Sequence, residues 1–169
     1  SATTATINGA ILANGGNGGY AADPAGSGGS IRLDVGTLSG AGVIAANGGN
    51  GYVAGGSGGG GRVAVYYADM SGFTLANVRA HGGTGGQGAG GVGSVYLKTS
   101  SGAGILRIDN HGSAVGALMP LGTPVDTSFE ADHLVISGTG TVVAPEHNMP
   151  IVANRISLED GGVLTHRAA

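Results

Sequence analysis

Three stretches of sequence decide the fold of this chain: GGSIRLDV (28–35), GGRVAVYY (60–67) and VGSVYLKT (92–99). Each begins 32 residues after the one before it, and apolar and polar residues alternate within each. Alternation over so short a run is typical of a half-buried β-strand, and a fixed period of this length is typical of a repeat array. The sequence therefore predicts parallel strands that stack in register, one from each repeat.

Stacking in register would place equivalent side chains of successive repeats next to one another. Aliphatic and β-branched residues dominate one set of alternating positions, as a buried sheet face prefers. The predicted inward ladders are Ile31–Val63–Val95 and Leu33–Val65–Leu97. The predicted outward ladders are Arg32–Ala64–Tyr96 and Asp34–Tyr66–Lys98.

A second run precedes each of these strands: AILANGG (10–16), VIAANGG (43–49) and NVRAHGG (77–83). The residues before the paired glycines are expected at corners, because Asn tolerates a left-handed backbone and can stack in ladders. These predicted corner residues are Asn14, Asn47 and His81. The His would end the Asn ladder at the third repeat.

Glycine-rich stretches connect the two runs of each repeat, at residues 15–29, 48–61 and 82–93. Glycine allows neighbouring backbones to approach closely, so we expect these stretches to stack along one side of the molecule. On this interpretation, Val in place of Gly59 should be more harmful than an ordinary loop substitution.

The last third of the chain has a shorter period. LVISGTGTVVAP (134–145) aligns with ISLEDGGVLTHR (156–167) at a step of 22 residues. The fold expected from both periods is all-β: a single right-handed parallel β-helix over residues 1–169, of about five coils. Residues 1–104 would form the glycine-rich coils, and residues 105–169 the shorter ones.

The composition excludes several classes of protein. Glycine supplies 38 of the 169 residues, which is unfavourable for helices, yet it does not recur every third residue as collagen requires. A net charge of −3 with scattered basic residues gives no nucleic-acid footprint, and no apolar run is long enough for membrane insertion. Cysteine is absent, so there is neither a disulfide framework nor a thiolate site.

The sequence predicts no catalytic, cofactor-binding or metal-binding residues. Gly58–Gly61 resembles a phosphate loop only in composition, because no Lys follows and the chain enters a strand. The five histidines lack the spacing of a zinc site, and Asp126, Glu130 and Asp132 are interpreted as turn residues, with calcium binding a weaker alternative. Tyr66, Tyr67 and Tyr96 are the only candidates for a carbohydrate platform.

The order of ILANGG, GGGGRVAVYY, VRAHGGTGG, GSVYLK and LEDGGVLTH resembles a glycine-rich segment of large secreted or surface-anchored bacterial proteins, which is expected to form parallel β-helices. The resemblance implies an extracellular or cell-surface structural or adhesive module, acting as a stiff stalk or filament building block, and no enzyme. The partners expected are other copies of the chain or flanking segments, since the chain is interpreted as a piece of a longer protein whose coils continue at both ends. The alternative is a β-helix that binds or degrades carbohydrate, as in tail spikes and lyases. An ice-binding array is disfavoured, because the threonines do not recur at ladder positions.

Overall fold

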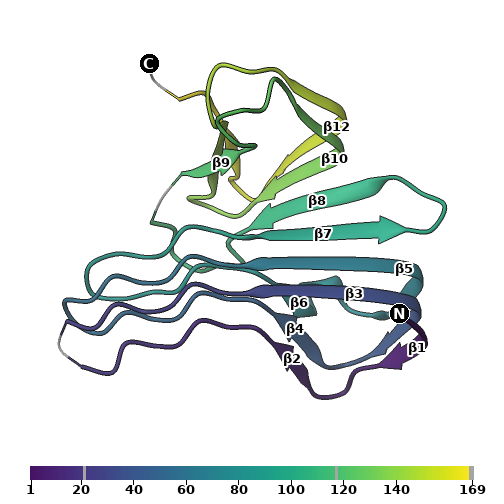
Figure 1. Ribbon diagram of the computed structural model, residues 1–169, viewed down its shortest axis with the longest axis horizontal. Coiled ribbons are helices and arrows are strands. Elements are labelled where there is room, and N and C mark those ends of the chain that lie inside the picture. The colour runs from purple at the N-terminus through teal and green to yellow at the C-terminus, as the bar shows by residue number, and fades with distance from the viewer. Residues whose placement is uncertain (21, 117, 168–169) are drawn as a thin grey trace.

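Strands dominate the chain in the computed structural model, which describes residues 1–20, 22–116 and 118–167 (Figure 1). A seven-stranded sheet has the order β1-β3-β5-β7-β8-β10-β12. Its strands are Ala2–Thr6 (β1), Ser30–Gly40 (β3), Arg62–Phe73 (β5), Ser94–Thr99 (β7), Gly104–Asp109 (β8), Phe129–Ser137 (β10) and Ile151–Glu159 (β12).

Two three-stranded parallel sheets accompany the large one. The first has the order β2-β4-β6, with strands Ala10–Leu12, Val43–Ala45 and Val78–Arg79. The second has the order β13-β11-β9, with strands Val163–Leu164 (β13), Val142–Pro145 (β11) and Met119–Leu121 (β9). The helix found among the described residues is a single 3₁₀ turn, Leu75–Asn77, and no helix there could cross a membrane.

The prediction of a single parallel β-helix is wrong. The seven-stranded sheet is mixed, and none of the three sheets closes or coils. The physical reason is a reversal of the chain after β7: residues 100–103 form a tight turn, and β8 runs antiparallel to β7. The strands that follow, β8, β10 and β12, are again parallel to one another.

The reversal places two hydrophobic cores on opposite faces of the seven-stranded sheet. Neighbouring residues of a strand point to opposite faces. Leu97 pairs with Ile105, and both contact the first core, whereas Tyr96 pairs with Leu106, which contacts the second core. The first core includes Leu38, Ile44, Val63, Val65, Val78 and Val95, and the second includes Ile108, Leu121, Leu134, Ile136 and Val143.

The glycine-rich segments run side by side away from the sheets (Figure 1). Their backbones are hydrogen-bonded to one another: Gly28 N donates to Gly59 O at 2.9 Å, and Gly60 N donates to Gly91 O at 2.9 Å. Glycine is needed for this packing because many of these backbones lie too close to a neighbouring carbonyl for a Cβ atom to fit.

Candidate functional site

The predicted corner residues lie next to one another in the structure. Asn14 Oδ1 accepts a hydrogen bond from Asn47 N–H at 2.8 Å, and Asn47 Oδ1 accepts one from His81 N–H at 3.2 Å. The bonds therefore join each side chain to the backbone of the next repeat, not side chain to side chain. They satisfy the N–H groups of Asn47 and His81, just beyond β4 and β6, and none of the three residues has the left-handed backbone expected of a corner.

A second ladder of this kind was not predicted. Asn17 Oδ1 accepts from Asn50 N–H at 2.8 Å, and Asn50 Oδ1 accepts from Thr84 N–H at 2.8 Å. The signal was present in the sequence, since NGGN, NGGN and HGGT occupy residues 14–17, 47–50 and 81–84. The paired glycines thus separate two lines of side chains that bind the repeats together.

The predicted apolar ladders also lie side by side. Ile31 pairs with Val63, which pairs with Val95, and Leu33 pairs with Val65, which pairs with Leu97. Ile31 is buried in the first core with Val63, Val65, Val95 and Leu97, while Leu33 is half-buried at its margin. These residues hold three repeats together through burial, which contributes about 25 cal/mol for each Å² of apolar surface removed from water.

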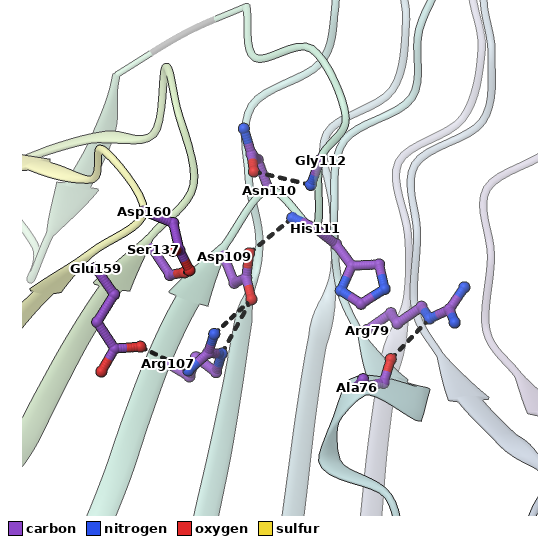
Figure 2. A network of polar contacts seen from close by, with 10 residues as sticks. All are labelled: Ala76, Arg79, Arg107, Asp109, Asn110, His111, Gly112, Ser137, Glu159 and Asp160. Carbon is purple, nitrogen blue, oxygen red and sulfur yellow. Dashed lines mark hydrogen bonds and ion pairs between the residues drawn. The ribbon is translucent and has the colours of Figure 1, made fainter.

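A polar network lies where the two halves of the chain meet (Figure 2). Arg107 of β8 donates to Asp109 Oδ2 through Nε at 3.0 Å and through Nη2 at 2.8 Å. The same guanidinium reaches Glu159 of β12 at 3.4 Å. One arginine therefore joins the ends of two strands that are separated in the sheet by β10.

The turn after β8 is fixed by two carbonyl-bearing side chains. Asp109 Oδ1 accepts from His111 N–H at 2.7 Å, and Asn110 Oδ1 accepts from Gly112 N–H at 3.1 Å. Asn110 is only 2% exposed, and its Nδ2 donates to Thr139 O at 2.7 Å. His111 has a φ of 53°, a left-handed conformation that these hydrogen bonds support.

Two imidazoles stack at this junction. The His81 and His111 ring centroids are 6.3 Å apart and the ring planes differ by 6°. Burial lowers the pKa of His111 below its ordinary value, and the nearby charge of Arg79 lowers it further, while Asp109 opposes the shift. The neutral imidazole is therefore favoured, which suits a stacked pair that would repel if both rings were charged.

A cavity of about 190 Å³ adjoins this network. Its apolar wall includes Val78, Ala80 and Val95, and its polar wall includes Arg107 and His111. Because Arg107 is already engaged by two carboxylates, the arrangement serves to connect strands. Among the residues that the structure describes, no three His, Cys, Asp or Glu side chains are grouped to hold a metal ion.

Of the three acidic residues interpreted as turn residues, only Asp126 lies in a turn, whereas Glu130 and Asp132 lie in strand β10. Asp126 Oδ2 accepts from Thr123 N–H at 2.7 Å, and His133 Nε2 lies 2.9 Å from Ser157 Oγ. Comparison of the chain with family models, curated proteins and solved structures found no match.

Proposed function

We propose that this chain is a structural or adhesive module of an extracellular bacterial protein, and that it acts as a stiff building block of a stalk or filament. The observation that carries the proposal is the continuous bonding between repeats in the glycine-rich half. Parallel strands, Asn side chains and glycine backbones each join one repeat to the next, for example through Gly15 N and Asn47 O at 2.8 Å. A segment whose strands, Asn side chains and glycine backbones are all bonded to the next repeat resists bending and local opening.

The outermost strands support assembly with a further partner. Among the described residues, β1, β2, β12 and β13 each pair on one side only. Such edges are templates for further strand pairing. Strands β2 and β12 also expose aliphatic side chains, since Leu12 is 59% exposed and Leu158 is 54% exposed. The partners that fit are another copy of the chain or a flanking segment of a longer one.

The extracellular and bacterial parts of the proposal rest on the sequence. The chain shares its glycine-rich texture with the secreted segments that it resembles, and the absence of cysteine is compatible with an extracellular bacterial setting. A hydrogen-bonded glycine array also suits an environment rich in proteases, because cleavage requires local unfolding of the backbone.

Self-association of the isolated chain tests the proposal. Successive residues of a strand direct their N–H groups to opposite sides. The Ile7 N–H donates to Ser39 O on the side of β3, so the Thr4 N–H, three residues earlier, is directed away from β3. Thr4→Pro should remove one outward donor while leaving the bonds to β3 intact, and Thr4→Val is the matched control that keeps the donor.

We expect the unmodified chain and Thr4→Val to form elongated, concentration-dependent assemblies in sedimentation velocity and electron microscopy. Thr4→Pro should shift this equilibrium toward the monomer. A monodisperse monomer at high concentration, with the outer strands β1, β2, β12 and β13 all protected from hydrogen exchange, would contradict the proposal.

A further inference from the structure

We propose that the seven-stranded sheet carries a binding groove for a neutral oligosaccharide, centred on Tyr96 and Tyr66. The groove lies on the face of the sheet opposite the first core. The groove lies where the first half of the chain ends and the second core begins. This inference does not require assembly, because the tyrosine pair lies on the inner strands β5 and β7, and the groove reaches an edge strand only at β12.

Two tyrosine rings form the centre of the groove. The Tyr66 and Tyr96 ring centroids are 6.0 Å apart, and the rings meet edge to face at 65°. Arg32 holds Tyr66 from the other side, with its Cζ 4.5 Å from the ring centroid. Arg32 is itself paired with Asp34 at 3.1 Å. The rings are therefore held before any ligand arrives, which lowers the entropic cost of binding.

Gly104 makes room for the Tyr96 ring. A Cβ atom at this position would overlap the Tyr96 hydroxyl and ring, so the ring lies across bare backbone. Tyr offers an apolar ring together with a polar hydroxyl. This combination suits a pyranose ring, which presents C–H groups on its faces and hydroxyls at its rim.

Hollows lie on both sides of the tyrosine pair. One has a volume of about 530 Å³ and is lined by Tyr96, Phe129, Glu130, Asp132 and Asn154 among others. The other has a volume of about 500 Å³ and is lined by Asp34, Tyr66 and Lys98 among others. The first hollow adjoins Tyr96 and the second adjoins Tyr66, so a chain of several sugars laid across the tyrosine pair would enter both.

The polar groups of the larger hollow can bind hydroxyls. Glu130 is exposed and contacts Ser128 Oγ at 3.3 Å, and the Asn154 side chain is exposed, with no hydrogen bond to other described residues. Asp132 Oδ2 accepts from Gly104 N–H at 2.7 Å and lies 3.3 Å from Lys98 Nζ. These two contacts lower the pKa of Asp132 below its ordinary value.

The residues of the groove favour binding of a glycan over its cleavage. They also favour a neutral glycan over an acidic glycan or a peptide. Glycoside hydrolysis needs a carboxylic acid with a raised pKa, whereas the pKa of Asp132 moves in the opposite direction. The negative charge of Glu130 disfavours acidic sugars. At the tyrosine pair a peptide cannot add as a further strand, because β5, β7 and β8 are each paired on both sides.

Titration with neutral oligosaccharides tests the groove. The probes are cello-, xylo-, malto- and chito-oligosaccharides of several units, followed by calorimetry and by tyrosine fluorescence, which is clear because the chain has no Trp. At least one of them should bind, and Tyr96→Ala should weaken that binding about tenfold. Glu130→Gln, on an exposed side chain, should weaken it about fivefold or more.

The controls separate the groove from general effects. Tyr20→Ala removes a ring that is 80% exposed in the first glycine-rich segment, and it should leave binding unchanged. Tyr96→Phe keeps the ring and guards against misfolding of the alanine variant. Failure of all probes to bind, equal loss in Tyr20→Ala, or tighter binding of an oligogalacturonate would overturn the proposal.

Discussion

Neighbouring glycines in the stacked segments have different roles. A Cβ atom at Gly58 would overlap the carbonyl oxygen of Gly26, and one at Gly90 would overlap that of Gly58. At Gly59 the nearest atom to such a Cβ is Gly91 O at 3.7 Å, an ordinary contact. The structure therefore speaks against Gly59 as a sensitive position, because a Cβ atom there has room, whereas one at Gly58 would overlap the backbone of the preceding repeat.

The two glycines provide a matched pair of substitutions. Gly58→Ala should lower the free energy of unfolding by about 2 kcal/mol, because overpacking forces the backbones apart. Gly59→Ala should be neutral or stabilise by up to about 1 kcal/mol, because alanine restricts the unfolded chain. Urea denaturation of both variants checks this, and equal effects at the two positions would contradict the close-packed arrangement.

At the level of strands, the sequence was informative where repeats match and uninformative where the chain turns back. The 32-residue period predicted the neighbours of Val63 and Val65 correctly, because side-chain alternation and burial fix the register. The reversal at residues 100–103 was missed, because Ser-Ser-Gly-Ala carries the same turn signal as any other corner. The polar network of Arg107 and the hollow beside Tyr96 both depend on that reversal, so the sequence predicts neither, although it does single out Tyr66 and Tyr96 as candidate platform residues.

The Asp132 carboxylate of β10 connects β8, the strand after the chain reversal, with β7. Its carboxylate accepts the Gly104 N–H at the start of β8 and pairs with Lys98 of β7. Asp132→Ala should speed hydrogen exchange at Gly104 and destabilise the fold. Asp34→Ala, which removes another exposed carboxylate from the same face, should leave exchange at Gly104 unchanged.

The same substitution should alter the response to acid. The Gly104 hydrogen bond and then Lys98 lower the pKa of Asp132 in the folded state. Its contribution to stability is therefore complete above the ordinary pKa of about 3.9 and is lost as the pH falls through the lowered value. Asp132→Ala should lack this part of the acid dependence, and an unchanged pH profile would contradict the role assigned to the carboxylate.

In the whole molecule, the two hydrophobic cores lie on opposite faces of one seven-stranded sheet. Ile105 contacts the first core and its neighbour Leu106 contacts the second, so β8 cannot open without disturbing both. Arg107 adds a connection from β8 to Glu159 at the far strand. The described part of the chain should therefore unfold as a single cooperative unit in spite of its two separate interiors.

Substitution in each core tests this cooperativity. Leu38 of the first core and Leu134 of the second are fully buried, so Leu38→Ala and Leu134→Ala should each cost roughly 2–5 kcal/mol. If the sheet couples the cores, each variant shifts one common transition, measured by circular dichroism and by hydrogen exchange in both halves. The double variant should show nearly additive loss, because the two leucines lie in different clusters. Two transitions, each moved only by the substitution in its own core, would instead show that β7 and β8 join two halves that fold separately.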